Sequence, residues 1–345
     1  MTIATGLIGY GYAGATFHAP LIAAAPGLRL AAVASSKPER VRAELLCVEP
    51  VPDAAALLAR PEIGLVVVAT PNAQHHPLAL AALRAGKHVV VDKPFALAAA
   101  EAEEMIAAAR AAGRVLSVFH NRRWDGDFLT LQALIAAGAL GRVHSYEANF
   151  DRWRPVVRDR WRERDEPGGG LLYDLGPHLI DQALALFGAP LRVAAALHRH
   201  RPGSPAVDAF DLRLDFGDAA ATLRAGMLTR LPRPRFVVHG TAGSFVKSGL
   251  DVQEDQLKAG LRPGAPGWGI EPAAQHAELA TETGGIALAA RPETLPGRYE
   301  AYYQGIAAAI AGEAPAPVPP EAGRDTLRII EAALLSAQEG RTVAL

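Results

Sequence analysis

The sequence predicts an α/β protein in which an N-terminal, doubly wound parallel sheet precedes an α+β domain with a mostly antiparallel open sheet. Over the first 120 residues, short apolar runs alternate with helical patterns, whereas later segments alternate in polarity along single strands. A chain of 345 residues is also long for one hydrophobic core. We therefore expect two domains, at residues 1–121 and 122–345.

The strands expected in the first domain are rich in Val, Ile and Leu and show little polar alternation, which is typical of strands buried on both faces of a parallel sheet. They lie at residues 3–8, 28–34, 64–69, 88–91 and 115–119. Ala- and Leu-rich helical segments separate these strands, and Gly residues such as Gly86 provide C-caps. Repeated strand–helix units predict right-handed crossovers.

The second domain has a different pattern of helices and half-buried strands. We expect helices at 127–137 and 174–187, and strands at 143–150, 208–216, 222–229 and 236–240. The segment 260–296 is rich in Gly and Pro, so we expect a long ordered loop there. Two helices, at 298–311 and 321–338, complete the chain, and the last of them could pack back on the first domain.

Composition excludes several classes of function. The formal net charge of −1 provides no field that would favour nucleic acid or an anionic membrane. Cys47 is the single cysteine, so an intramolecular disulfide and a thiolate-rich metal site are both excluded. We expect no signal peptide, because no basic segment precedes an apolar block, and no apolar stretch reaches the roughly 20 residues of a membrane span. We therefore expect a cytoplasmic protein.

A G-x-G-x-x-G motif follows the first expected strand and opens a helix. In this setting it predicts a dinucleotide site and identifies the parallel sheet as a Rossmann fold. Gly9 permits a tight turn, Gly11 lets the backbone approach a pyrophosphate, and Gly14 allows close packing of helix and strand. The N–H groups at this helix N-terminus, around Tyr12 and Ala13, suit phosphate. A Gly-rich turn without a ligand is the alternative.

The end of the second expected strand predicts which dinucleotide is bound. NAD enzymes carry Asp or Glu there to bind the ribose 2′-hydroxyl, but this strand ends in Ser35, Ser36 and Lys37. Two hydroxyls and an ammonium suit a 2′-phosphate, which a carboxylate would repel. The sequence therefore favours NADP over NAD. Alternatively, Ser35 simply caps the next helix.

Asp92, Lys93 and Pro94 follow the fourth expected strand, at the edge where open α/β sheets bind ligands. Burying an unpaired ammonium is costly, so Lys93 makes sense there if it binds a substrate hydroxyl, with Asp92 as its charge partner. A surface lysine fits the same residues equally well.

A second cluster lies on the helix expected after three consecutive glycines. Asp174 and His178 are four residues apart and share a helix face, which Asp181 extends. A histidine with a pKa near ~6.5 can exchange a proton near neutral pH, as interconversion of an alcohol and a ketone requires. A core or capping histidine and a metal site of Asp-x3-His-x2-Asp type are alternatives. We predict no metal.

Together, these motifs closely resemble those of the Gfo/Idh/MocA oxidoreductases, the family of glucose–fructose oxidoreductase and inositol dehydrogenase. The resemblance extends over nearly the whole chain and is carried by residues 9–14, 69–76, 85–94 and 174–178. The family usually has Glu where Asp92 stands. The stretches 119–125 and 151–162 look like the subgroup that contains NADP-dependent scyllo-inositol dehydrogenases.

The resemblance implies a role for each matching residue. Lys93, Asp174 and His178 would be catalytic, with His178 as the proton acceptor, and the Lys93–Pro94 bond would be cis. The implied cofactor contacts are Gly9, Gly11, Tyr12, Ala13, Gly14, Ser35, Ser36, Lys37, Thr70, Pro71, Asn72, His75, Asp92, Lys93, Asn121, Trp161 and Arg162. The implied substrate contacts are Lys93, Asn121, Arg122, Arg152, Asp174 and His178.

The expected activity is hydride transfer between NADP(H) and a sugar or polyol, by a homodimer or homotetramer. Two other activities occur on this fold: cofactor sensing without turnover, and glycoside hydrolysis with a tightly held nicotinamide. The stretch 151–166 has six Arg and five acidic residues, so it predicts a salt-bridged loop with substrate contacts rather than a nucleic-acid surface.

Overall fold

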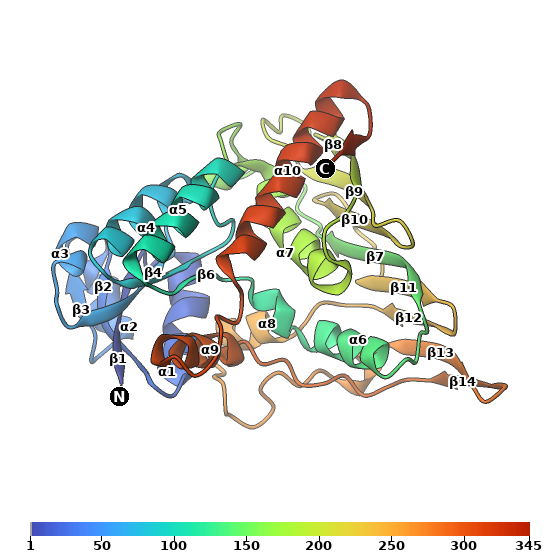
Figure 1. Ribbon diagram of the computed structural model, residues 1–345, viewed down its shortest axis with the longest axis horizontal. Coiled ribbons are helices and arrows are strands. Elements are labelled where there is room, and N and C mark those ends of the chain that lie inside the picture. Colours follow the sequence, from blue (N-terminus) through green and yellow to red (C-terminus); the bar gives the residue numbers. More distant parts are fainter. Residues whose placement is uncertain (1) are drawn as a thin grey trace. The chain divides into compact units, whose positions relative to one another are not determined.

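The computed structural model describes residues 2–345 and contains two compact units, each built from three separate stretches of the chain. The first unit comprises Met1–Trp124, Gln253–Trp268 and Arg298–Arg324, and the second comprises Asp125–Val252, Gly269–Gly297 and Asp325–Leu345. The colours of Figure 1 follow the chain as it leaves and re-enters each unit. Each unit has its own sheet, as the predicted fold class requires.

The first unit contains a six-stranded, entirely parallel sheet of order β3-β2-β1-β4-β5-β6. Its strands are β1 (Ile3–Ile8), β2 (Leu28–Ala34), β3 (Glu49–Val51), β4 (Ile63–Val68), β5 (His88–Val91) and β6 (Leu116–Val118). The central strands are buried along most of their length, which explains their uninterrupted Val, Ile and Leu. Because all six strands are parallel, their carboxyl ends lie at the same edge of the sheet.

Helices connect these strands and return from distant parts of the sequence. The helical elements are η1 (Gly14–His18), α1 (Ala19–Ala24), α2 (Pro38–Glu44), α3 (Ala54–Leu58), η2 (Asn72–Gln74), α4 (His75–Arg84), α5 (Ala99–Ala112), η3 (Asn121–Trp124), α8 (Gln253–Lys258) and α9 (Glu300–Ala311). The helix after the glycine motif contains the π-helical turn η1, a feature that is frequent at functional sites.

The second unit contains a nine-stranded sheet of order β14-β13-β12-β11-β7-β10-β9-β8-β15. Its strands are β7 (Val143–Asp151), β8 (Arg192–His198), β9 (Ala209–Asp215), β10 (Ala220–Gly226), β11 (Phe236–Gly240), β12 (Gly243–Lys247), β13 (Glu278–Thr283), β14 (Ile286–Ala290) and β15 (Val343–Ala344). β7 and β10 pair in parallel, and every other neighbouring pair in this sheet is antiparallel. The sheet is therefore mixed but mostly antiparallel.

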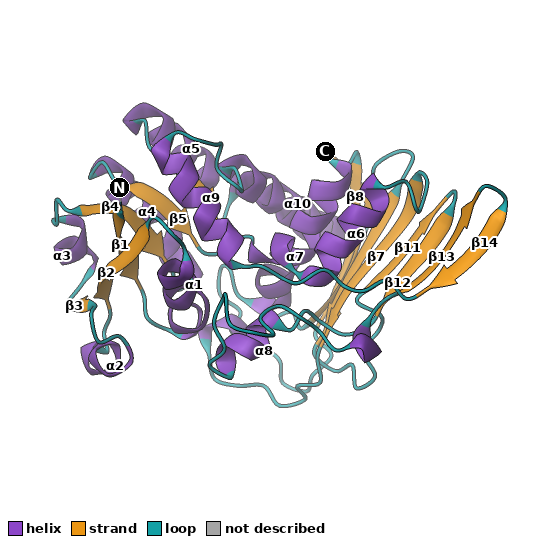
Figure 2. Cartoon of the chain, turned by 90° about the horizontal axis from the view of Figure 1, so that it is seen from below, coloured by secondary structure: helices purple, strands orange, loops and turns teal. Residues whose placement is uncertain are grey.

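Two long helices of the second unit lie on the same side of this sheet (Figure 2). They are α6 (Gly126–Ala136) and α7 (Gly170–Phe187), and α7 packs against β7, β9 and β10. The short turns η4 (Trp161–Glu163) and η5 (Ala273–Gln275) and the helix α10 (Pro320–Glu339) complete the element list. None of the helices in the described chain is both long and apolar enough to cross a membrane.

The expectation of a long loop over residues 260–296 is wrong. This segment contains the antiparallel strands β13 and β14, whose backbones pair from Leu279 with Ala290 to Thr283 with Ile286. Gly284 and Gly285 join them with φ values of +60° and +79°. Two adjacent residues with positive φ form the tight turn that matches the twist of a hairpin. The Gly and Pro content of the whole segment concealed this local Gly-Gly signal.

Candidate functional site

Five loops follow strands of the parallel sheet and therefore meet at its carboxyl edge. They begin at Gly9 after β1, Ser35 after β2, Ala69 after β4, Asp92 after β5 and Phe119 after β6. The chain runs outward from β1 to β2 on one side, whereas β4 pairs with β1 on the other. Ligands of open α/β sheets bind at such a switch point. The sequence-predicted cofactor residues of this unit lie on these loops or the helices that follow them.

The three motif glycines occupy different environments. Gly9 has a φ of +100°, and a Cβ there would overlap with the carbonyl of Ala69. A Cβ on Gly14 would overlap with the carbonyl of Gly9. By contrast, among residues 2–345 no heavy atom other than those of Gly11 and its two chain neighbours lies within 4 Å of the position that a Cβ on Gly11 would take. Gly9 and Gly14 are therefore required by the fold, while Gly11 leaves open space beside the backbone, as an approaching pyrophosphate needs.

The loop after β4 adds a polar group that suits a ligand. The Oγ1 atom of Thr70 is buried and has no hydrogen-bond partner within residues 2–345. The imidazole of His75 fixes this loop, because Nδ1 lies 2.7 Å from the Pro94 carbonyl and Nε2 lies 3.0 Å from the Thr70 carbonyl. Burial lowers the pKa of His75, while the charge of Asp92 and the two carbonyls oppose that effect. The Thr70 hydroxyl and the open space at Gly11 together fit a dinucleotide.

The turn after β2 keeps two of its three predicted cofactor residues exposed, and Ser35 does not cap the next helix as the alternative interpretation requires. Ser35 Oγ accepts a hydrogen bond of 3.1 Å from the Lys37 backbone N–H, so Ser35 stabilises the turn, whereas Lys37 is the N-cap of α2. Ser36 and Lys37 are exposed. The turn therefore leaves one hydroxyl and one ammonium accessible to an anion.

Glu254 of α8 connects the glycine motif to a residue after β6, and no sequence motif marks it. Its carboxylate accepts a hydrogen bond of 2.7 Å from the Tyr12 hydroxyl and lies 2.9 Å from Nη2 of Arg122. Burial raises the pKa of Glu254, but the charges of Arg122 and Lys258 and the Tyr12 hydroxyl outweigh it and bring the pKa to about 2. Glu254 therefore fixes two predicted contact residues, Tyr12 and Arg122.

A buried polar chain lies behind Lys93. The Lys93–Pro94 bond is cis, as expected from the resemblance. Asp92 Oδ1 accepts a hydrogen bond of 2.8 Å from the Lys93 backbone N–H and lies 3.7 Å from Nε2 of His18. His18 Nδ1 in turn lies 2.6 Å from the Tyr303 hydroxyl of α9. Burial raises the pKa of Asp92, but interactions with His18, Lys93 and His75 outweigh it, and the pKa is about 2. A carboxylate thus anchors the Lys93 backbone.

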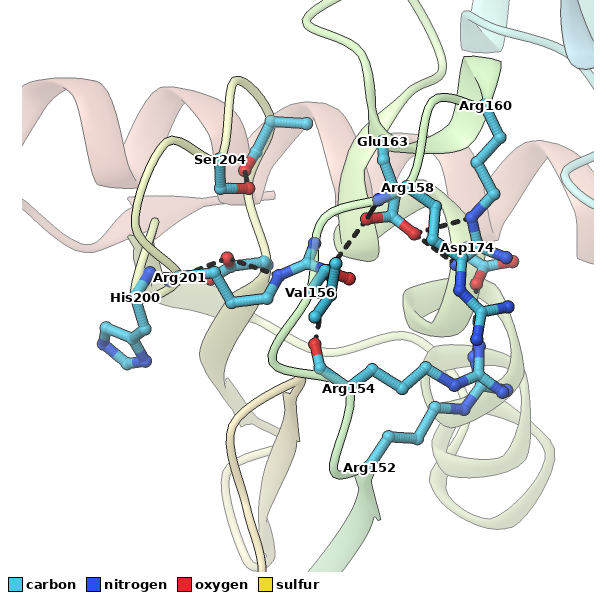
Figure 3. Close-up of polar contacts among 12 residues, drawn as sticks. Arg152, Arg154, Val156, Arg158, Arg160, Glu163, Asp174, His200, Arg201 and Ser204 are labelled. Atoms are coloured by element: carbon cyan, nitrogen blue, oxygen red, sulfur yellow. Dashed lines mark hydrogen bonds and ion pairs between the residues drawn. The ribbon is translucent and has the colours of Figure 1, made fainter.

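The second unit holds the remaining predicted catalytic residues on α7. Asp174 lies in the second turn of this helix, and His178 follows one turn later. Arg152 Nη1 and Arg162 Nε lie 3.6 Å from the two carboxylate oxygens of Asp174. The guanidinium of Arg162 also lies 4.6 Å from the ring centre of Trp161. Figure 3 shows Asp174 of α7 next to the arginine side chains of the preceding segment, Arg152 among them.

These side chains supply an acid–base group, a carboxylate and hydrogen-bond donors, which together can orient and deprotonate a hydroxyl. Within residues 2–345, no three His, Cys, Asp or Glu side chains are grouped closely enough to hold a metal ion.

Two family models match the chain. One, described as oxidoreductase family, NAD-binding Rossmann fold, matches residues 3–120. The other, described as oxidoreductase family, C-terminal alpha/beta domain, matches residues 132–345. The first matched range contains every strand of the parallel sheet, and the second contains every strand of the mixed sheet.

Individual relatives cover the chain from end to end. It is 47% identical over 343 residues to an uncharacterized oxidoreductase, YdgJ, of Escherichia coli (strain K12), covering 99% of each chain. It is 40% identical over 347 residues to the scyllo-inositol 2-dehydrogenase (NADP(+)) IolW of Bacillus subtilis (strain 168), covering 100% of this chain and 96% of that protein. The solved structure of an oxidoreductase, yvaA, from Bacillus subtilis matches with a TM-score of 0.97 at 40% identity, covering 100% of this chain and 98% of the other.

Proposed function

Since this chain belongs to the Gfo/Idh/MocA family of NAD(P)-dependent oxidoreductases, we propose that it transfers a hydride between NADP(H) and a CH–OH or C=O carbon of an inositol-like polyol or sugar. The observation that carries this proposal is the pairing of Asp174 and His178 on α7 in a chain that also has a dinucleotide-binding loop with open space at Gly11. The relative named as an NADP-dependent scyllo-inositol 2-dehydrogenase supports both the cofactor and the substrate class.

Each catalytic residue has a separate task in this proposal. The bound nicotinamide supplies the hydride acceptor or donor. His178 accepts the hydroxyl proton during oxidation and returns it during reduction. Asp174, fixed by Arg152 and Arg162, orients the hydroxyl that reacts. Lys93, anchored through Asp92, donates a hydrogen bond to the substrate oxygen and stabilises the charge that develops on it.

The remaining predicted residues bind the two ligands. Ser36 and Lys37 would hold the 2′-phosphate of NADP, and Ser35 would support their turn. The other proposed contacts of the cofactor are Tyr12, Ala13, Thr70, Pro71, Asn72, His75, Asn121, Trp161 and Arg162. Arg122 and Asn121 would contact the substrate. We also propose that the enzyme is cytoplasmic. We further propose that it acts as a homodimer or homotetramer, and light scattering on the purified protein would measure its molar mass.

The proposal is tested by assaying a panel of inositols, aldoses and other polyols with NADP and with NAD. We expect kcat/KM to be at least about tenfold higher with NADP, equivalent to about 1.4 kcal/mol of transition-state stabilisation. His178→Ala should lower kcat by roughly 10²- to 10⁴-fold and remove the acid limb of the pH profile for oxidation. NADPH binding, measured by nicotinamide fluorescence, should stay within about twofold.

Other results would identify a different activity. Hydrolysis of a glycoside without net cofactor reduction would indicate a nicotinamide-dependent glycosidase, and cofactor binding without any turnover would indicate a sensor. Normal turnover and an intact acid limb in the His178→Ala enzyme would show that another residue is the base, with Lys93 the next candidate.

A further inference from the structure

A buried arginine lies between two buried carboxylates in the second unit (Figure 3). Arg201, Glu163 and Asp208 are 4%, 5% and 1% exposed, although all three side chains carry charge. Arg201 Nη1 lies 2.8 Å from Glu163 Oε2, and Arg201 Nε lies 3.0 Å from Asp208 Oδ2. Removing three charges from water is costly unless each is paired and hydrogen-bonded. The cluster therefore requires further polar partners.

Backbone groups provide those partners. Asp208 accepts hydrogen bonds from the backbone N–H groups of His200 and Arg201. Glu163 accepts one from the backbone N–H of Arg158. Burial raises the pKa values of both carboxyls, but these N–H groups and the Arg201 guanidinium outweigh it, so both pKa values lie below their usual range. Both carboxylates therefore stay ionised, and the Arg201 guanidinium is held between them.

Arg201 contacts one particular segment of the chain at several points. Its Nη1 lies 3.4 Å from the carbonyl of Arg154 and 3.5 Å from that of Val156, in addition to its contact with Glu163. We call residues 152–163 the arginine loop. Its two ends carry Arg152 and Arg162, the residues whose guanidinium groups lie 3.6 Å from Asp174. The buried cluster therefore fixes the backbone that carries both partners of Asp174.

We propose that Arg201, through its ion pair with Glu163, is a positioning residue that sets the arginine loop so that Arg152 and Arg162 orient Asp174 toward the polyol. The inference rests on the proposed function, in which Asp174 touches the substrate. Arg201 itself acts only through the loop. Most proposed contacts of the cofactor lie outside the arginine loop, which carries only Trp161 and Arg162 of them. Loss of Arg201 should therefore impair use of the polyol more than binding of NADPH.

Three variants test this inference. Arg201→Met keeps the length of the side chain and removes its charge, and Glu163→Gln keeps the shape of the partner and removes the charge that holds it. Arg224→Met is the matched control, because Arg224 also bridges two carboxylates of the second unit, Glu147 and Asp211, at 2.9 and 2.8 Å, but it lies on β10. Glu163→Gln also serves as a milder variant if Arg201→Met does not fold.

The kinetic readout separates positioning from general damage. We expect Arg201→Met to lower kcat/KM for the polyol by about 10- to 100-fold, since small misplacements of orienting groups have effects of this size. Glu163→Gln should cause a smaller loss of the same kind. The Kd for NADPH should rise by no more than about threefold in both, because only Trp161 and Arg162 of the proposed cofactor contacts lie on the arginine loop. Arg224→Met should leave both quantities unchanged. Folded variants that retain kcat/KM within twofold, or that lose NADPH affinity equally, would overturn the inference.

A second readout does not depend on turnover. Trypsin cleaves after arginine, and the arginine loop offers Arg158, Arg160 and Arg162 as sites. Release of this loop should accelerate cleavage at these sites by about tenfold in Arg201→Met and not in Arg224→Met, because cleavage follows the open population of the segment. Unchanged cleavage would overturn the inference. A wild-type enzyme that turns over no polyol, with accelerated cleavage in the variant, would instead show that the proposed function is wrong and that the loop is nonetheless held by Arg201.

Discussion

At the scale of single residues, Asp92 shows how a buried charge can be kept ionised beside a catalytic candidate. Its carboxylate lies near His18 and binds the backbone of Lys93, and its pKa falls from an ordinary value of 3.8 to about 2. A carboxyl whose pKa is lower in the folded state stabilises that state above its unfolded pKa. The stabilisation is therefore complete above about pH 4 and is lost as the pH falls through about 2.

This shift gives a prediction for Asp92→Asn. The pKa difference corresponds to about 2 kcal/mol, so the variant should be less stable than the wild type by roughly this amount at pH 7. The difference should shrink steadily between pH 4 and pH 2, as measured by urea unfolding at each pH. Glu254 titrates in the same range in both proteins and cancels from the comparison. A difference in stability that does not depend on pH would show that the neighbours of Asp92 do not lower its pKa.

At the scale of elements, the loop between β1 and η1 separates a structural glycine from one that a ligand requires. We expect Gly14→Ala to destabilise the fold, because the added Cβ would overlap with the Gly9 carbonyl. Gly11→Ala should leave the melting temperature within a few degrees, since its Cβ enters open space, yet raise the Kd for NADPH by about tenfold or more. Calorimetry and nicotinamide fluorescence measure the two effects. Equal behaviour of both variants in both measurements would contradict this assignment.

Most elements of the first unit were predictable because their signals are local. The ranges expected for β1, β2 and β5 agree with the structure, since buried parallel strands are continuous apolar runs bounded by turns. The three-residue edge strand β3 was missed, because Glu49, Pro50 and Val51 form no apolar run. In the second unit, α7 begins at Gly170, four residues before the expected start. Glycine is a poor helix former, so three consecutive glycines indicate a loop at the position where this helix in fact begins.

The candidate site was predictable only where a motif marks it. The glycine motif, the Asp92–Pro94 segment and the Asp174–His178 pair could each be read within a few residues of sequence. Glu254 lies 242 residues from Tyr12, and Tyr303 lies 285 residues from His18. No local pattern encodes such pairs, because chain topology alone brings them together. Arg201 belongs to the same class, since its partner Glu163 is 38 residues away.

At the scale of the whole molecule, the first unit is incomplete without chain from beyond residue 250. The ring centre of Phe119 lies 4.9 Å from that of Tyr302 and 5.8 Å from that of Tyr303, and both tyrosines are fully buried. Gln253 of α8 binds the carbonyl of Trp124 and the backbone N–H of Tyr299. The six strands of the parallel sheet therefore depend on α8 and α9 for part of their core.

A fragment of residues 1–124 tests this dependence. It contains all six strands but lacks the aromatic residues of α9, so we expect it to bind a hydrophobic dye and to unfold without a cooperative transition. The full chain should unfold cooperatively under the same conditions. Circular dichroism in urea makes the comparison, and a fragment with a sharp transition at the same midpoint would show that α8 and α9 add little.

The interleaved path of the chain has a consequence for biosynthesis. A ribosome releases the six parallel strands first, but Tyr302 and Tyr303 emerge more than 180 residues after Phe119. Small domains often fold as soon as they are synthesised, N-terminal domain first. Here the first unit reaches its full complement only when Arg324 has left the ribosome, and by then the second unit lacks only its last 21 residues, Asp325–Leu345. The nascent chain must therefore carry exposed apolar strands through most of its translation, and it is during this interval that chaperones would have to protect it.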